Sequence, residues 1–183
     1  MDEILIVLAN GAEECEALCV YDILKRGGLN PVLKGLGSNR IVSSHSVSFL
    51  LDDTLSEKDL EKNYRVVFLP GGMPGATNLK ESELLSRILK RTSERGDIVT
   101  AICASPAVVL GPLGLLEGHK ATCYPGCEEY YKDFTFLSDG VVTSGNIITA
   151  KSAGWAFDLG LEILRVLKGE DEKERVRKQI YYK

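Results

Sequence analysis

Cys103 is the residue of this chain whose type and setting most favour chemistry. An apolar, β-prone run over 98–102 ends at this cysteine, and the small residues Ala104 and Ser105 follow before Pro106. The pattern predicts a strand, a sharp turn and a helix, because small residues let the backbone pass closely and proline suits a first helical turn. A cysteine on such a turn is the thiol version of a nucleophile elbow, which holds the reactive atom at the carboxyl edge of a sheet.

The alternative interpretation of Cys103 is structural. Free cysteine is among the most buried residue types and often only fills space in a core. The predicted turn favours the reactive interpretation, because helix amides and the helix dipole stabilise a thiolate. We therefore expect the Cys103 thiol to have a lowered pKa.

Two further segments of unusual sequence follow predicted strands. Residues 10–16 (NGAEECE) follow a strand expected over 3–9, and residues 70–75 (PGGMPG) follow one expected over 65–69. The carboxyl ends of parallel strands share one edge of a sheet, so both segments should lie near Cys103. There Gly71 and Gly72 can present backbone N–H groups to a developing oxyanion. The alternative is that the two glycines only form a turn that needs a positive φ.

Three glutamates, Glu13, Glu14 and Glu16, open the helix expected over 13–27. Acidic residues stabilise the first turn of a helix through its dipole, which is a sufficient role for Glu13. Glu16 differs because it falls on the apolar face of the helix, where a carboxyl needs a polar partner. A carboxylic acid that keeps its proton can donate a hydrogen bond to a thiolate. Glu16 is therefore the predicted proton-transfer partner of Cys103.

The remaining chain alternates predicted strands and helices. Strands are expected over 3–9, 31–36, 65–69, 97–102, 141–143 and 147–150, and helices over 13–27, 56–62, 83–95 and 153–167. One or two short antiparallel strands are expected within 42–51, and a surface helix or tail over 169–183. This alternation predicts one α/β domain over 1–183, a doubly wound, mostly parallel sheet with helices on both faces.

Composition narrows the classes of function. The chain has 183 residues, of which 44% are hydrophobic and 26% charged, with a formal net charge of −4. These values are ordinary for a soluble globular domain. They provide no basic surface for nucleic acid, and no apolar run has the length of a membrane span. The acidic start, Met1-Asp2-Glu3, lacks the basic region of a secretory signal, so a cytoplasmic protein is expected.

Cysteine spacing does not predict a metal site. The five cysteines are Cys15, Cys19, Cys103, Cys123 and Cys127. An odd number in a chain of this size does not indicate a disulfide framework. Two pairs share a C-x3-C spacing, but they lie far apart in sequence, and His45 and His119 add no ligand motif and are expected on the surface or in loops.

The glycine motifs do not predict a cofactor. Residues 35–37 (GLG) lack the third glycine of a dinucleotide-binding loop, and the chain has no P-loop. The glutamates that follow the first strand would repel a phosphate group. We therefore expect neither a metal nor a cofactor.

Three ordered motifs together resemble the ThiJ/PfpI family. They are residues 8–16 (LANGAEECE), 67–72 (VFLPGG) and 101–106 (AICASP). The similarity runs over nearly the whole chain, including residues 149–154 (TAKSAG), and is nearest to the branch of the parkinsonism-associated protein deglycase.

This resemblance implies a flavodoxin-like α/β sandwich that usually forms a homodimer, with helix 13–27 as the expected dimer surface. It implies that Cys103 is the family's reactive, oxidation-prone cysteine and that Glu16 is the protonated glutamate in contact with its sulfur. Gly72 and Ala104 match backbone positions that line the pocket. Family members are described as glyoxalases, protein deglycases, redox sensors, chaperones and, in another branch, peptidases.

Two positions depart from the family's patterns. In the peptidase branch a histidine directly follows the cysteine, whereas this chain has Ala104, which argues against peptidase activity. In the deglycase branch a histidine often lines the pocket after the elbow helix, and the matching residue here is Tyr124. Its phenol, with a pKa near ~10, is a poor base at neutral pH, although Glu16 can still transfer a proton.

The predicted function is cofactor-independent chemistry on small reactive carbonyls, of the glyoxalase or deglycase type. Cys103 would add to the carbonyl and Glu16 would carry the proton. Two alternatives remain open. One is a redox-sensing, protective protein in which Cys103 oxidises to a sulfinate. The other is a holdase chaperone with an incidental cysteine.

Overall fold

A computed structural model describes residues 3–183 of the chain. The strands of the central sheet are β1 (Glu3–Leu8), β2 (Asn30–Gly35), β5 (Asp53–Thr54), β6 (Tyr64–Leu69), β7 (Ile98–Ile102), β8 (Val141–Ser144) and β9 (Ile147–Ala150). A separate antiparallel pair consists of β3 (Arg40–Val42) and β4 (Ser48–Leu50). The helices are α1 (Glu14–Arg26), α2 (Gly75–Lys80), α3 (Glu83–Glu94), α4 (Ala156–Lys168) and α5 (Glu170–Gln179). Short 3-10 turns occupy Glu57–Leu60, Cys127–Tyr130 and Ala153–Trp155, and a π-helical turn occupies Pro106–Leu110.

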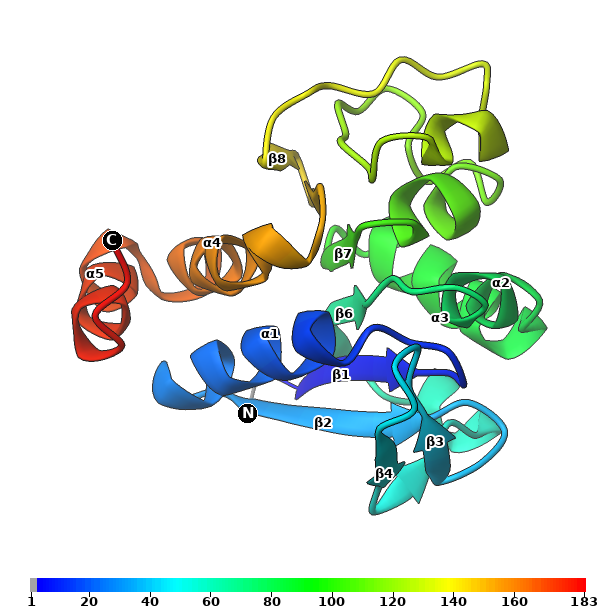
Figure 1. Ribbon diagram of the computed structural model, residues 1–183, viewed down its shortest axis with the longest axis horizontal. Coiled ribbons are helices and arrows are strands. Elements are labelled where there is room, and N and C mark those ends of the chain that lie inside the picture. The colour runs from blue at the N-terminus through cyan, green and yellow to red at the C-terminus, as the bar shows by residue number, and fades with distance from the viewer. Residues whose placement is uncertain (1–2) are drawn as a thin grey trace.

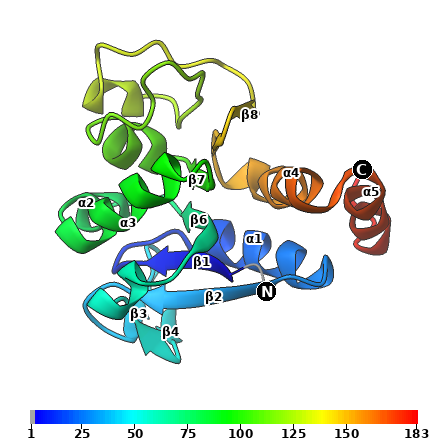
Figure 2. The ribbon, with the colours of Figure 1, turned by 180° about the vertical axis from the view of Figure 1, so that it is seen from behind.

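The central sheet has the strand order β5-β2-β1-β6-β7-β9-β8. Its neighbouring strands are parallel except for β8 and β9, which form a hairpin. Figures 1 and 2 show α1 and α4 on one face of the sheet, with α2 and α3 on the other. The predicted doubly wound α/β fold is confirmed.

The two faces of the sheet carry separate apolar cores, because successive strand residues point to opposite sides. In β1, Ile4 and Ile6 pack with residues of α1 and α4, whereas Leu5 and Val7 pack with residues of α2 and α3. The two helices on the first face pack closely at Gly160, where an added Cβ would lie 2.9 Å from the Cβ of Ile23. The alternation of buried residues therefore fixes α1, and the glutamates at its start, against the sheet.

The chain after the elbow differs from the prediction. The expected helix is only a five-residue π-helical turn, followed by an irregular segment that leads to β8 (Figure 1). The reason is local, since Pro112 cannot continue a regular helix and the glycines at 111 and 114 disfavour one. Helix α2 was not expected, because its six residues begin with Gly75 and show too short a periodic pattern. The surface helix at the C-terminus is present as α5.

No helix between residues 3 and 183 is both long enough and apolar enough to span a bilayer.

A buried ion pair joins β2 to the 3-10 turn that follows the edge strand β5. The Lys34 Nζ lies 2.9 Å from an oxygen of Asp59, whose side chain is fully buried. Tyr64 Oη and the Ser56 amide also donate to the Asp59 carboxylate, at 2.6 and 2.9 Å. Burial alone would raise the pKa of Asp59, but the bonds from Tyr64 and Lys34 outweigh it and keep that pKa below its ordinary value. Asp59 is therefore ionised and fully partnered in the folded chain.

Replacing Asp59 with alanine should strongly destabilise the protein, because it removes the buried partner of Lys34. Lys34 would keep its ion pair with the exposed Asp53, 2.6 Å away, but would lose its buried carboxylate. We therefore expect a loss of roughly 3 kcal/mol in the free energy of unfolding. Urea denaturation measures it. The control is Asp52→Ala at an exposed position, which should change the stability by less than about 0.5 kcal/mol. Similar losses in the two variants would contradict this role of Asp59.

Candidate active site

Cys103 lies directly after β7 in a strained backbone conformation. Its φ is +64°, in the left-handed region that residues other than glycine rarely adopt. Its amide donates to the carbonyl of Ala150 at 2.9 Å, and its carbonyl accepts from the amide of Tyr124 at 2.8 Å. Ser105 Oγ donates to the carbonyl of Pro70 at 2.6 Å, which ties the turn to the end of β6. The sharp turn predicted at Cys103 is therefore present, and its backbone is held on both sides.

Glu16 reaches the elbow from the first turn of α1. Its side chain is fully buried, and its Oε2 accepts a hydrogen bond from the Gly71 amide at 2.7 Å. Glu13 caps the same helix, because its Oε2 accepts from the Glu16 amide at 2.6 Å. The structure thus separates the two glutamates as the sequence predicts, with Glu13 at the helix start and Glu16 facing inward.

Two glycines allow the three loops to meet. A Cβ added at Gly71 would lie 2.6 Å from the Cβ of Cys103 and 2.9 Å from Oε2 of Glu16. Gly72 has a φ of +84°, and an added Cβ would lie 2.4 Å from the carbonyl oxygen of Gly11. Both positions require glycine, one for space and the other also for its backbone conformation. The loops after β1, β6 and β7 therefore converge as expected.

The Glu16 carboxyl has an unusual affinity for a proton. Burial raises its pKa to about 7, the Glu13 charge acts in the same direction, and hydrogen bonds with Gly71 and Cys103 act against both. Its other oxygen, Oε1, is buried and has no hydrogen-bond partner of normal geometry in the part of the chain that the structure describes. We place the proton of the neutral form on Oε1, because an oxygen that accepts no hydrogen bond is the easier one to protonate.

The pKa of the Cys103 thiol is raised. Burial is the largest cause, followed by the charge and hydrogen bond of Glu16, while the amides of Gly72 and Ala104 act in the opposite direction. The prediction of a lowered thiol pKa is thus wrong. The two amides do not outweigh burial beside a carboxylate, and the π-helical turn after the elbow is too short to supply a large helix dipole.

Cys103 and Glu16 titrate as a pair, because the two groups are in contact. The first proton leaves near the Glu16 pKa of about 7. A thiol beside a carboxylate and a thiolate beside a carboxylic acid have the same charge, so the carboxylate can accept the thiol proton as sulfur attacks. The site therefore supports a nucleophile that is activated by a general base at neutral pH.

The other predicted pocket residues have different placements. Ala104 is buried beside Cys103, and Gly72 is half-buried. Tyr124 is 48% exposed and is joined to the elbow through its backbone amide. Tyr124 was expected at the pocket only from the resemblance to the deglycase branch, and its hydrogen bond to the Cys103 carbonyl has no sequence signal.

The remaining thiols are held in their protonated form. Burial raises the pKa of Cys123 to about 12 and also raises that of Cys19 and Cys127. The charge of Glu13 is the main cause of the raised pKa of Cys15. What distinguishes Cys103 is contact with a fully buried carboxyl, that of Glu16, because the carboxyl that contacts the Cys15 thiol is the half-buried Glu13.

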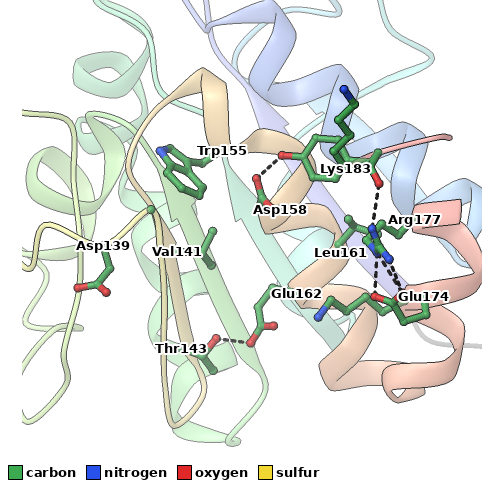
Figure 3. A pocket seen from close by; sticks show the side chains of 13 residues that line it. Asp139, Val141, Thr143, Trp155, Asp158, Leu161, Glu162, Glu174, Arg177 and Lys183 are labelled. Carbon is green, nitrogen blue, oxygen red and sulfur yellow. Dashed lines mark hydrogen bonds and ion pairs between the residues drawn. The ribbon is translucent and has the colours of Figure 1, made fainter.

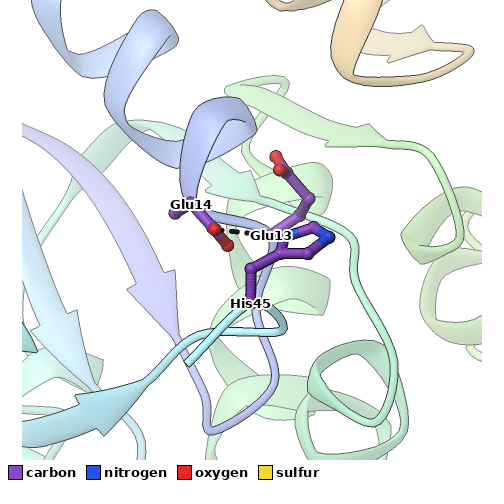
Figure 4. A group of neighbouring side chains, drawn as sticks. All are labelled: Glu13, Glu14 and His45. Carbon is purple, nitrogen blue, oxygen red and sulfur yellow. Dashed lines mark hydrogen bonds and ion pairs between the residues drawn. The ribbon is translucent and has the colours of Figure 1, made fainter. Parts of the chain in front are cut away.

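One group of side chains near α1 contains metal-ligating atoms. Glu13, Glu14 and His45 each offer one such atom, and these atoms all lie within 4.8 Å of one another (Figure 4). His45 Nδ1 pairs with Glu14 Oε1 at 3.0 Å, and Glu13 caps the helix. These contacts explain the cluster without an ion, and the side chain of His45 is 71% exposed, as expected for a surface histidine.

A cleft of about 590 Å³ lies between β8, α4 and α5. Figure 3 shows Trp155 and Asp158 along it, together with the ion pair of Arg177 and Glu174. Tyr182 Oη donates to Asp158 at 2.5 Å, so polar side chains of this cleft largely satisfy one another. The cleft contains none of the predicted site residues.

Comparisons with known proteins agree with this geometry. A model of the DJ-1/PfpI family matches residues 2–166. Protein DJ-1 homolog B of Arabidopsis thaliana is 36% identical over 171 residues, which cover 93% of this chain and 39% of that protein. Glutathione-independent glyoxalase DJR-1.2 of Caenorhabditis elegans is 29% identical over 180 residues, which cover 97% of this chain and 94% of that protein. The solved structure of oxidized Toxoplasma gondii DJ-1 has 31% identity and a TM-score of 0.94, and the match covers 100% of this chain and 99% of that one.

The fold and the elbow define a flavodoxin-like α/β protein with a cysteine at the carboxyl edge of its sheet. The chain belongs to the DJ-1/PfpI family, and its similarities lie in the DJ-1 branch. It spans well under half the length of the Arabidopsis relative, 39%.

Replacing Gly71 with alanine should disturb the site through space alone. The added Cβ would meet both Cys103 and Glu16, so we expect a loss of about 1–3 kcal/mol in the free energy of unfolding, measured with urea. The control is Gly154→Ala, where the nearest atom lies 3.9 Å from the added Cβ. Equal stability of the two variants would show that Gly71 is not needed for the close approach.

The raised pKa of Glu16 makes stability depend on pH. A neutral Glu16 favours the folded chain fully below its ordinary pKa of 4.5, and this contribution is lost as pH rises through about 7. Glu16→Gln cannot ionise, so its stability relative to the native chain should rise by roughly 3 kcal/mol between pH ~4.5 and ~8. Urea denaturation at several pH values measures this difference. Glu94→Gln, at an exposed position, should show no such trend, and a pH-independent difference for Glu16→Gln would contradict the buried, proton-holding carboxyl.

Proposed function

We propose that this protein is a cofactor-independent catalyst that acts on small reactive carbonyls through Cys103, in the manner of a glyoxalase or deglycase. The observation that supports this most is the contact between Cys103 and Glu16, whose pKa of about 7 suits a proton carrier at neutral pH. The family relationship supports it too, since a C. elegans relative is named a glutathione-independent glyoxalase.

The first step is addition of sulfur to an aldehyde. With methylglyoxal, the Cys103 sulfur bonds to the aldehyde carbon while the thiol proton passes to the Glu16 carboxylate. The carbonyl electrons move to oxygen, which then takes a proton to give a hemithioacetal. The amides of Gly72 and Ala104, which already point at the sulfur, stabilise the developing negative charge.

The second step moves a proton between neighbouring carbons. Glu16 removes the proton from the carbon bonded to sulfur and returns a proton to the adjacent carbon, while the hydroxyl proton of the first carbon passes to the oxygen of the second. The first carbon is thereby oxidised and the second reduced. The product is a thioester, which water hydrolyses to lactate with release of the thiol. The sum is methylglyoxal plus water to lactate, with no external oxidant or reductant. Tyr124 serves as a hydrogen-bonding residue at the mouth of the site and not as the base.

Redox sensing is the second candidate function. Oxidation of Cys103 to a sulfinate would place an anion where two backbone amides already point. The similarity to a solved structure named as oxidized Toxoplasma gondii DJ-1 supports this candidate.

Lactate formation from methylglyoxal tests the catalytic proposal. Cys103→Ser should abolish turnover, because it removes the attacking sulfur. Glu16→Gln should lower turnover by about 10²–10⁴-fold, the usual contribution of a general acid–base group. Cys19→Ser is the control and should keep the native rate. Lactate formation that does not depend on Cys103 would refute the proposal.

Treatment with mild peroxide tests redox sensing separately from catalysis. Trypsin should release Cys103 in peptide 96–120, apart from the other four cysteines. If the protein is a sensor, that peptide gains two oxygen atoms before any other cysteine is oxidised. Even oxidation of all five thiols would exclude a specific sensor.

A further inference from the structure

A second pair of cysteines lies on a tight turn beside the elbow. The amide of Cys127 donates to the carbonyl of Tyr124 at 2.9 Å and closes a turn across Pro125 and Gly126. Gly126 has a φ of +93°, and a proline followed by a glycine in this conformation is typical of a type II turn. The turn therefore folds the chain back on itself between Cys123 and Cys127.

The Cys123 thiol and the Cys127 amide both contact the carbonyl oxygen of Tyr124. Cys123 Sγ lies 3.5 Å from the carbonyl oxygen of Tyr124, which is the same oxygen that accepts the Cys127 amide. The two thiols are also close enough to interact electrostatically, since a charge on Cys127 raises the pKa of Cys123. The turn thus brings the Cys123 thiol and the Cys127 backbone to the same carbonyl group.

We propose that Cys123 and Cys127 form a reversible dithiol–disulfide pair, which closes by exchange with a small-molecule disulfide. Cys127 is half-buried and Cys123 is 3% exposed, so Cys127 reacts first. Its thiolate attacks one sulfur of the small disulfide, which forms a mixed disulfide and releases one thiolate. Cys123 then attacks the Cys127 sulfur and releases the second thiolate. The dithiol loses two electrons and two protons, and the small disulfide becomes two thiols.

The environment of the pair sets the speed and persistence of closure. Burial raises the pKa of both thiols, so exchange is slow at neutral pH and accelerates as pH rises. A disulfide has no charge, so the same burial does not oppose the closed form. Closure of the disulfide takes place next to the elbow, because Tyr124, which follows Cys123, donates its amide to the Cys103 carbonyl at 2.8 Å.

The chain contains a matched comparison with the same C-x3-C spacing. Cys15 and Cys19 lie on α1, where Cβ atoms four residues apart are about 5–6 Å from each other. A disulfide needs Cβ atoms about 3.5–4.5 Å apart, so the helical pair cannot close without unwinding the helix. Selective closure of the pair on the turn is therefore a property of the folded chain.

Peptide mapping tests the proposal on the intact protein. The reduced protein is incubated with oxidised glutathione at pH ~8.5, near the ordinary thiol pKa, and then treated with iodoacetamide and trypsin. Peptide 121–132 contains both cysteines of the turn, and peptide 1–25 contains both cysteines of the helix. We expect peptide 121–132 to lose its alkylation and two hydrogen atoms, while peptide 1–25 remains alkylated at both positions.

Two controls decide the origin of any closure. In Cys127→Ser the closed form of peptide 121–132 should disappear, whereas in Cys103→Ser it should still form, so the result does not depend on the proposed catalysis. Unfolding in urea should remove the difference between the two peptides. Full alkylation of peptide 121–132, glutathione adducts without closure, or equal closure in both peptides of the folded protein would overturn the proposal.

Discussion

The site depends on one interaction, the burial of the Glu16 carboxyl against the Cys103 sulfur. Removal from water makes the carboxyl bind its proton near neutral pH, and the carboxylate in turn opposes a charge on sulfur. Neither group alone provides a reactive thiol at neutral pH. Together they share one proton at the pH where the protein would need to move it, which is why a thiol with a raised pKa remains a credible nucleophile.

The fold produces this contact from three separate loops. Alternating apolar residues in β1 fix α1 on the sheet and turn Glu16 inward, while β7 delivers Cys103 to the same edge. Gly71 donates its amide to the carboxyl, and a Cβ added there would press against both side chains. The geometry of the site thus follows from the register of the strands and from the glycine at position 71.

Much of this arrangement is predictable from sequence because it depends on local patterns. The elbow at Cys103 follows from an apolar run and small residues, and the inward position of Glu16 follows from helical periodicity. The direction of the thiol pKa is not predictable in that way, since it depends on burial and on a carboxyl from a distant loop. The hydrogen bond from the Tyr124 amide to the Cys103 carbonyl likewise arises only from tertiary structure.

The most direct test is the rate of Cys103 alkylation by iodoacetamide as a function of pH, followed on peptide 96–120 in the native chain and in Glu16→Gln. In the native chain the rate should rise with a midpoint near the Glu16 pKa of about 7. In the variant the midpoint should move above ~8.5, the ordinary value for a thiol, because the buried sulfur has lost its base. Identical midpoints in the two proteins would contradict the shared proton on which the account rests.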